Sequence, residues 1–201
     1  MITGPRYKIA RRLGASVFDK TQTQKFAMRS SSKDIKKKKR AGSDFGLQLL
    51  EKQRARFTYG LGEKQFKNLV EKVQSKRGGD INEALVQALE TRLDNTVYRL
   101  GFASTRQAAR QMVNHGHIDV NGKRNTIPSY QVSIGEIVTI REGSKKKPLF
   151  KDIDDKLKEQ RIPSWLALNK EKKEAKIQGL PKKPANELSF DVSQIFQYYN
   201  R

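Results

Sequence analysis

The strongest constraint on the fold of this 201-residue chain is its surplus of positive charge. It carries 42 Lys and Arg residues against 21 Asp and Glu residues, and only 35% of its residues are hydrophobic. So small an apolar fraction permits one or two lean cores beneath a charged surface. A net charge of +21 favours a polyanion as partner, either a nucleic acid or an anionic membrane surface.

Several classes of protein are excluded by what the sequence lacks. No apolar run approaches the roughly 18–20 residues that a membrane-spanning helix requires, and the first residues do not have the build of a signal peptide. Cysteine is absent, which removes disulfides, cysteine-based zinc sites, iron–sulfur clusters and thiol catalysis. We therefore expect no cofactor, no metal and no membrane partner.

The positive charge is concentrated near the N-terminus. The first sixty residues contain sixteen Lys and Arg residues and four Asp and Glu residues. Residues 1–42 show little helical or strand periodicity, and their charges are interspersed with Tyr7, Phe18 and Phe26. A basic run can also be a solvated patch or a nuclear-localisation-like signal. The recurring charge and the aromatic residues favour an arm that becomes ordered on RNA or DNA.

Residues 43–90 have the pattern of a helical domain. Ser43 or Asp44 is a suitable N-cap for its first helix. The apolar positions within 66–73 follow the i, i+3, i+4, i+7 spacing of an amphipathic helix. Asp80 or Asn82 is a suitable cap for a third helix, so the sequence predicts a helical unit with a basic surface.

The next stretch, 91–142, predicts a helix–turn–helix followed by a small antiparallel sheet. Ser104 begins the second helix as a capping-box residue, with Gln107 as its partner. Asn121 and Gly122 form a strong signal for a two-residue hairpin, since both tolerate positive φ. The strands are expected at 118–120, 130–132 and 137–140.

The basic side chains of this stretch suit phosphate groups. Arg106 and Arg110 are four residues apart and therefore share one helix face. Guanidinium groups stay charged and bind phosphate oxygens in pairs, and Lys123 and Arg124 are expected at the hairpin tip. A helix–turn–helix alone could dock in DNA, but the sheet and the hairpin pair favour recognition of RNA shape.

Long motifs connect the chain to a known family. Residues 92–122 closely resemble the RNA-binding module named after the fourth protein of the small ribosomal subunit, through the stretches RLDNTVYRLGF and STRQAARQMVNHGHIDVNG. That module also occurs in pseudouridine synthases and tyrosyl-tRNA synthetases. The flanking stretches SDFGLQLLEKQRARFTYG and IPSYQV are similar to the ribosomal protein itself. The resemblance is to the bacterial or organellar type of this ribosomal family, and it spans nearly the whole chain.

The resemblance implies a structural protein of the small ribosomal subunit and not an enzyme. Such a protein binds the small-subunit ribosomal RNA directly at a multi-helix junction of its 5′ domain, nucleates assembly of the subunit body and contributes to translational accuracy. Its implied partners are the fifth small-subunit ribosomal protein, other proteins of the body, and messenger RNA (mRNA) where it enters the subunit. The implied location is a cytoplasmic small subunit or one of an organellar ribosome.

The implied fold is α+β. A basic extended arm (1–42) precedes a mostly helical domain (43–90), on which residues 185–201 pack back. The RNA-binding module occupies 91–155 and contains the helix–turn–helix and the small antiparallel sheet. A Lys-rich C-terminal extension follows over 156–201.

The resemblance also implies which basic side chains face RNA. Lys38, Lys39 and Arg40 correspond to the residues that line the mRNA channel. Cysteines that bind zinc in many bacterial members are absent here, so the arm is expected to be fixed by RNA and by packing. The complete set of expected RNA-facing residues is Lys8, Arg11, Arg12, Lys38, Lys39, Arg40, Lys52, Arg54, Arg56, Arg92, Arg99, Arg106, Arg110, His115, Lys123 and Arg124.

Three competing interpretations depend on particular residues or segments. Asp94, in the stretch RLD, is similar in context to the catalytic aspartate of one pseudouridine synthase group, but only a short Lys-rich segment follows the module. We expect Asp94 to be a cap or an ion-pair partner within its own helix. His115 and His117 could be metal ligands, but no carboxylate cluster accompanies them, and a phosphate contact or packing is expected for His115. A membrane-surface role fails because the lysine run has no adjacent amphipathic anchor.

Overall fold

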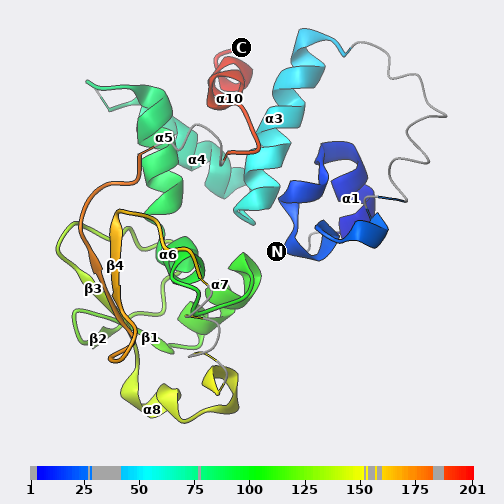
Figure 1. Cartoon of the computed structure of the whole chain (residues 1–201). Coiled ribbons are helices and arrows are strands. Elements are labelled where there is room, and N and C mark those ends of the chain that lie inside the picture. The colour runs from blue at the N-terminus through cyan, green and yellow to red at the C-terminus, as the bar shows by residue number, and fades with distance from the viewer. Residues whose placement is uncertain are drawn as a thin grey trace. The chain divides into compact units, whose positions relative to one another are not determined.

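A computed structural model of the protein describes residues 4–26, 28, 42–76, 78–151, 153, 157, 160–182 and 188–201. The chain divides into two compact units, one formed by Met1–Leu85 with Lys183–Arg201 and the other by Val86–Lys182 (Figure 1). The described part of the first unit is helical, and the second combines helices with one sheet. The predicted α+β class is therefore confirmed.

The N-terminal segment is more regular than the sequence predicted. In place of an extended arm, its described part forms α1 (Arg6–Leu13) and the short 3-10 turns η1 (Ala15–Val17) and η2 (Asp19–Thr21). The apolar side chains of Ala10 and Leu13 lie on one face of α1 and are buried. Two buried side chains in a helix of eight residues give too weak a periodic signal to stand out among so many charges.

Two longer helices follow in the first unit. These are α3 (Asp44–Thr58) and α4 (Glu63–Gln74), and the predicted N-cap of α3 is confirmed because the Ser43 hydroxyl accepts the N–H of Gly46 at 3.2 Å. The C-terminal helix α10 (Val192–Tyr199) packs along α3. A hydrogen bond of 3.2 Å from Gln48 Nε2 to Gln197 Oε1 joins these two helices.

α5 (Ile81–Glu90) leads into the second unit, in which α6 (Leu93–Arg99) and α7 (Arg106–Asn114) form the predicted helix–turn–helix. These last two helices pack against each other. Thr105, not Ser104, caps α7: it is the last residue with extended backbone, and its hydroxyl accepts the N–H of Ala108 at 3.1 Å. The predicted cap was therefore wrong by one residue.

The sheet of the second unit has five antiparallel strands in the order β2-β1-β3-β5-β4. The hairpin between its first two strands is confirmed, because Asn121 and Gly122 both have positive φ, 50° and 74°. The strands are β1 (Ile118–Val120), β2 (Lys123–Arg124), β3 (Ile137–Ile140), β4 (Leu166–Asn169) and β5 (Glu174–Ile177).

Two features of this sheet differ from the sequence prediction. The expected strand at 130–132 is a single bridge between Gln131 and Arg92, because this segment pairs with the start of α6 and not with a strand. Strands β4 and β5 come from the C-terminal extension and complete the sheet. Ala175 and Ile177 are buried while Lys176 between them is exposed, and this alternation is hidden among the lysines of the region.

The apolar core of the second unit lies between the helices and the sheet. Leu93 and Val97 of α6 pack with Ile118, Val138 and Ile177 of the strands, all of them fully or almost fully buried. Trp165 belongs to the same core. Of the helices within the described residues, none is long and apolar enough to cross a membrane.

Candidate nucleic-acid interface

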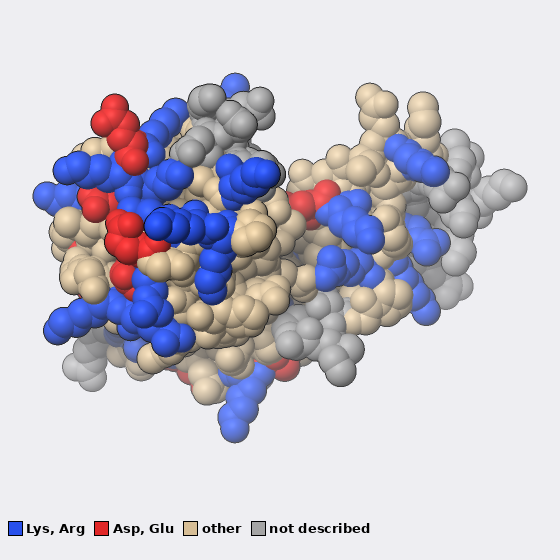
Figure 2. Space-filling view, turned by 90° about the horizontal axis from the view of Figure 1, so that it is seen from below, with Lys and Arg blue, Asp and Glu red and all other residues tan. Residues whose placement is uncertain are grey.

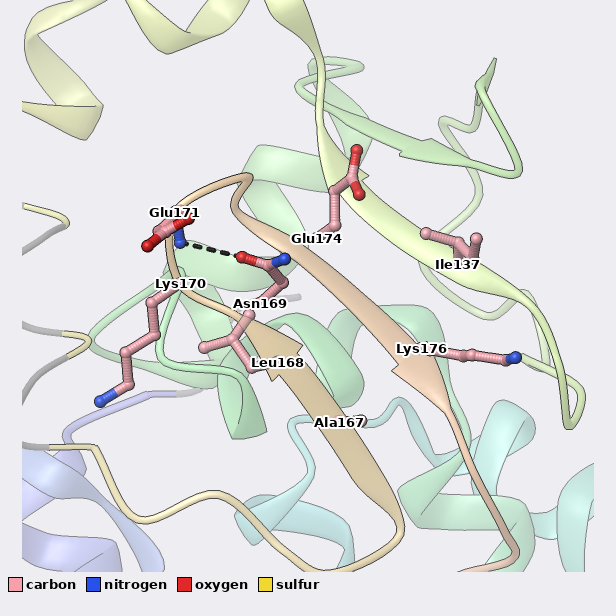
Figure 3. A pocket seen from close by; sticks show the side chains of 8 residues that line it. All are labelled: Ile137, Ala167, Leu168, Asn169, Lys170, Glu171, Glu174 and Lys176. Carbon is pink, nitrogen blue, oxygen red and sulfur yellow. Dashed lines mark hydrogen bonds between the residues drawn. The ribbon is translucent and has the colours of Figure 1, made fainter.

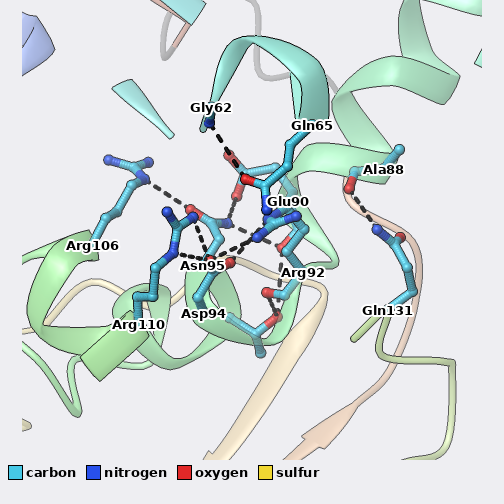
Figure 4. A network of polar contacts seen from close by, with 11 residues as sticks. Gly62, Gln65, Ala88, Glu90, Arg92, Asp94, Asn95, Arg106, Arg110 and Gln131 are labelled. Atoms are coloured by element: carbon cyan, nitrogen blue, oxygen red, sulfur yellow. Dashed lines mark hydrogen bonds and ion pairs between the residues drawn. The ribbon is translucent and has the colours of Figure 1, made fainter. Parts of the chain in front are cut away.

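Four arginines expected from the sequence to face RNA are bonded to buried polar side chains in the second unit, and Figure 4 labels three of them, Arg92, Arg106 and Arg110. Glu90 at the end of α5 and Asp94 in the first turn of α6 are each only 4% exposed. Asn95, beside Asp94, is buried as well. We call these three residues, together with Arg92, Arg99, Arg106 and Arg110, the arginine network.

One half of the arginine network is centred on Asp94. Its Oδ1 accepts from Arg92 Nε at 3.0 Å, and its Oδ2 accepts from Arg92 Nη2 at 2.9 Å. Oδ2 also accepts from Arg110 Nε at 2.9 Å and from Arg110 Nη2 at 2.7 Å. Asp94 is an ion-pair partner as expected, but its partners are Arg92 at the N-cap of α6 and Arg110 of α7, so the pairing extends beyond its own helix. One carboxylate thus holds a buried arginine and an arginine of α7 at the same time.

The other half is centred on Glu90. Its two carboxylate oxygens accept from Arg99 Nε and Nη2, both at 2.8 Å, and Oε2 also accepts from Asn95 Nδ2 at 2.8 Å. The other side of the Asn95 amide accepts from Arg106 Nε at 2.9 Å. The Arg106 guanidinium lies over the Tyr98 ring, 4.4 Å from its centroid. Arg106 and Arg110 are therefore fixed side by side on α7 through neighbouring residues of α6.

The C-terminal end of α7 brings His115 and Arg124 together. Both are exposed, and Arg124 Nη2 lies 3.4 Å from the carbonyl oxygen of His115. Gly116 between helix and strand has a φ of +68°, and a Cβ at this position would overlap the Arg124 guanidinium. Glycine is thus required here both for the backbone turn and for the approach of Arg124.

A buried histidine lies next to this pair. The His117 ring centroid is 6.0 Å from that of His115, and His117 Nδ1 is 2.9 Å from Ser144 Oγ of α8 (Glu142–Lys145). Burial lowers the pKa of His117 below its ordinary 6.5, and nearby positive groups lower it further. These groups are Lys147, His115, Arg124 and Arg141. Arg141 and Lys147 are not among the RNA-facing residues expected from the sequence, although the basic residues around Ser144 are visible in it.

The lowered pKa of His117 gives a prediction about stability. The unfolded chain binds a proton on His117 below about pH 6.5 that the folded unit binds only at lower pH, so stability should fall as the pH drops through this range. We expect the melting temperature of the wild type to decrease more between about pH 7.5 and 5.5 than that of His117→Gln. His115→Gln removes only one of the positive groups near His117, and because burial is the largest cause of the lowered pKa, this variant should keep most of the wild-type pH dependence. An equal pH dependence in wild type and His117→Gln would contradict the prediction.

The basic residues of the first unit fall into two groups. Lys8, Arg11 and Arg12 of α1 are exposed. Lys52 of α3 is only 4% exposed: its ammonium lies 2.5 Å from Glu63 Oε1 and 4.3 Å from the centroid of the Tyr198 ring. Lys52 therefore lies between α3, α4 and α10, where it stabilises the packing of these helices.

The two arginines that follow on α3 are partly buried. Arg54 donates through Nε to the Leu13 carbonyl at 2.6 Å and pairs with Glu51 at 2.5 Å. Arg56 donates through Nε to Gln53 Oε1 at 2.9 Å. Both arginines also keep part of their surface exposed. Lys38, Lys39 and Arg40 lie outside the described residues.

A pocket of about 680 Å³ lies on the outer face of the sheet, over strands β3, β5 and β4 (Figure 3). Its polar rim includes Asn169, whose Oδ1 accepts the backbone N–H of Glu171 at 3.1 Å. Lys170 and Lys176 are balanced by Glu171 and Glu174, so the pocket has no excess of positive charge. We assign it no part in binding a polyanion.

On the face shown in Figure 2, Lys and Arg side chains outnumber Asp and Glu side chains. In the described part of the chain, no group of three or more His, Asp or Glu side chains is arranged to hold a metal ion. The arrangement as a whole offers fixed guanidinium groups and exposed ammonium groups, which are suited to the phosphates of a folded nucleic acid.

Comparison with known proteins gives matches along the whole chain. Residues 1–90 match the family model described as the ribosomal protein S4/S9 N-terminal domain, and residues 91–138 match the S4 domain. The chain is 41% identical over 202 residues to a protein of Roseiflexus sp. (strain RS-1), with 98% of each chain covered. It is 42% identical over 201 residues to a protein of Lactiplantibacillus plantarum, with 99% of this chain and 98% of that protein covered. Both relatives are named small ribosomal subunit protein uS4.

Proposed function

The chain belongs to the uS4 family of small ribosomal subunit proteins, and on this premise we propose which of its surfaces bind ribosomal RNA. It is a structural, RNA-binding protein of the small subunit and not an enzyme. Its partners are ribosomal RNA and other ribosomal proteins. The proposal concerns the residues that make the RNA contacts and the place in the subunit where they do so.

In the second unit, the proposed RNA-binding surface is the exposed side of α7 and the β1–β2 hairpin. The observation that carries the proposal is that Arg106 and Arg110 are fixed on α7 by Asn95 and Asp94, at a distance from each other set by one helical turn. Phosphate groups of an RNA backbone are the complement of such paired guanidiniums. The surface also includes Arg99, His115, Lys123 and Arg124.

In the first unit, the proposed RNA-binding residues are the exposed cations of α1 and the partly exposed arginines of α3. Lys52 and Arg92 are buried, so we propose that they support the RNA-binding surfaces without touching phosphate. Lys38, Lys39 and Arg40 remain proposed contacts to mRNA, on the basis of their position before the stretch that begins with Ser43. The directly contacting residues of this unit are Lys8, Arg11, Arg12, Arg54 and Arg56.

We further propose that the RNA site is the multi-helix junction of the 5′ domain of small-subunit ribosomal RNA, and that binding there nucleates assembly of the subunit body. The fifth small-subunit ribosomal protein is the proposed neighbour, and this contact is the proposed route to translational accuracy. Supporting this, recognition through phosphates and helix shape suits a junction in which several RNA helices converge.

The salt dependence of binding tests this proposal. If about ten phosphates are neutralised, log K for small-subunit ribosomal RNA should fall with log[salt] with a slope of roughly −7 to −9. The 5′-domain fragment should bind as tightly as the full RNA, and an unrelated folded RNA of equal length should bind more weakly. Equal affinity for both RNAs would contradict recognition of a particular junction.

Gly116→Ala gives a local test of the contact made by Arg124. The new methyl group displaces the Arg124 guanidinium from its place beside His115, and we expect RNA binding to weaken by about three- to tenfold, which is one charged contact or less. Gly135→Ala is the matched control, because Gly135 also has a positive φ but a Cβ there meets nothing within 4 Å. Both variants carry the cost of a left-handed non-glycine residue, about 1 kcal/mol. Equal RNA affinities in the two variants would contradict the assignment of Arg124 to the RNA-binding surface.

A further inference from the structure

Two buried carboxylates lie directly beneath the surface proposed to bind RNA. A carboxylate repels phosphate, and the chain has only half as many acids as cations. Yet Glu90 and Asp94, each 4% exposed, hold arginines of the proposed surface. Their burial keeps them from touching RNA themselves, so any effect they have on binding passes through the arginines.

The bonds of Asp94 hold the guanidinium of one partly exposed arginine, Arg110. Arg110 approaches Oδ2 with both Nε and Nη2, which sets the position and the orientation of its guanidinium. The Arg110 side chain nevertheless stays 25% exposed, whereas that of Arg92 on the same carboxylate is 8% exposed. Asp94 thus holds Arg92 inside the unit and Arg110 at its surface.

Asp94 is itself firmly placed. It lies in the first turn of α6, and its backbone N–H donates to the carbonyl of Pro128 at 3.1 Å. The neighbouring N–H of Leu93 donates to the carbonyl of Tyr130 at 2.8 Å. The backbone of Asp94 therefore lies in α6 and is bonded next to the segment 128–130, so its carboxylate holds Arg110 from a fixed position.

We propose that Asp94 is a positioning residue for RNA binding, one that holds the Arg110 guanidinium ready for phosphate; this inference rests on the proposed RNA-binding function of α7. An arginine on a helix surface otherwise samples many rotamers, and their loss on binding weakens the complex. Because Asp94 already restricts the Arg110 side chain in the free protein, less conformational entropy is lost when RNA binds. The gain in order outweighs the repulsion between the carboxylate and phosphate, because the Asp94 charge is already shared between two guanidiniums.

The substitution Asp94→Asn distinguishes the positioning role from simple electrostatics, because the two predict opposite changes in RNA affinity. The change keeps the size of the side chain and makes the protein more positive by one charge, so electrostatics alone predicts tighter binding. The positioning account predicts binding weaker by about tenfold and a salt slope smaller by about 0.7–0.9, the contribution of one phosphate. The control Glu142→Gln removes one negative charge from an exposed residue of the same unit, and it should bind as tightly as the wild type or tighter.

A double-mutant cycle shows whether the effect passes through Arg110. The full-length wild type, Asp94→Asn, Arg110→Ala and the double variant are titrated with small-subunit ribosomal RNA, with the active fraction taken from a stoichiometric titration. Asp94→Asn should weaken binding in the wild type and change nothing further in the Arg110→Ala background. A role confined to folding would lower the active fraction in both backgrounds and leave the salt slope unchanged.

Arg110→Lys provides a second variant in case Asp94→Asn does not fold. It keeps the charge and leaves the Asp94–Arg92 pair in place, but it removes the two-point bond to Asp94. We expect binding several-fold weaker than the wild type, and wild-type affinity would overturn the proposal.

If the wild type itself shows no preference for small-subunit RNA, or Arg110→Ala binds normally, the proposed function fails. If Arg110→Ala is weak while Asp94→Asn binds normally or more tightly, only the positioning role of Asp94 fails.

Discussion

Replacing Arg106 and Arg110 together by alanine is expected to weaken binding to small-subunit ribosomal RNA by about 100-fold or more. Each charge-assisted contact to phosphate contributes about 1.5–3 kcal/mol, and 1.4 kcal/mol is a factor of ten. The salt slope should also become smaller, by about 1.4–1.8 for two phosphates. Filter binding or fluorescence anisotropy over a range of salt concentrations measures both quantities.

The double variant should keep the fold of the second unit. Without the two arginines, Asp94 still pairs with Arg92, and Asn95 still bonds to Glu90. The matched control is Lys170→Ala with Lys172→Ala, which removes two exposed cations from the β4–β5 turn of the same unit. The control should lose far less affinity than the arginine variant. Unchanged RNA binding with both arginines replaced would refute the assignment of α7 to the interface.

The largest expected effect on stability follows from Glu90→Gln. The buried carboxylate holds Arg99 through two bonds of 2.8 Å and Asn95 through a third. The removal of one member of a buried ion pair leaves the other charge without compensation and costs about 3–5 kcal/mol. Because the Arg99 side chain is 22% exposed, water offsets part of this cost, and we expect a loss of about 2–3 kcal/mol.

Chemical denaturation of the full chain, followed by a probe in the second unit such as the fluorescence of Trp165, measures this loss. Glu142→Gln makes the same chemical change at an exposed residue whose partner is Lys145. Exposed pairs of this kind contribute little, so the control should stay within about 0.5 kcal/mol of the wild type. Equal and small effects of the two substitutions would show that the arginine network does not stabilise the unit.

The parts of the fold that the sequence predicted well are those specified by neighbouring residues. The cap of α3 by Ser43 depends on an N–H three residues away, and the hairpin depends on Asn121 and Gly122 alone. Local patterns of this type are visible in one stretch of sequence. Strand β5 was missed for the opposite reason: Lys176 lies between two buried residues, and its burial pattern depends on pairing with β3, far away in the chain.

The candidate site divides in the same way. Spacing showed that Arg106 and Arg110 share a helix face, which the structure confirms. It did not show that Asp94, sixteen residues earlier, holds Arg110, because an ion pair between two helices depends on how they pack. Lys52 is a stronger example, since its aromatic neighbour Tyr198 lies near the other end of the chain. A sequence shows which charges exist, and only packing decides which of them reach the surface.

The arginine network also gives a reason for acids among the residues that we propose to bind RNA. A surface made only of cations would repel itself and leave its side chains mobile in the absence of RNA. Asp94, Glu90 and Asn95 hold the guanidiniums in place in the free protein. This arrangement requires two carboxylates to be buried. On the proposed function, the stability of the second unit and its affinity for RNA depend on the same side chains.

The most direct test of the central claim is co-sedimentation of the tagged protein with ribosomal subunits, followed by sequencing of the RNA that it protects. The account predicts that the wild type sediments with the small subunit and protects positions clustered in the 5′ domain of its RNA, and that the Arg106→Ala, Arg110→Ala variant gives much weaker protection. Absence of the wild type from the small subunit, or protections scattered without preference over the RNA, would contradict the account.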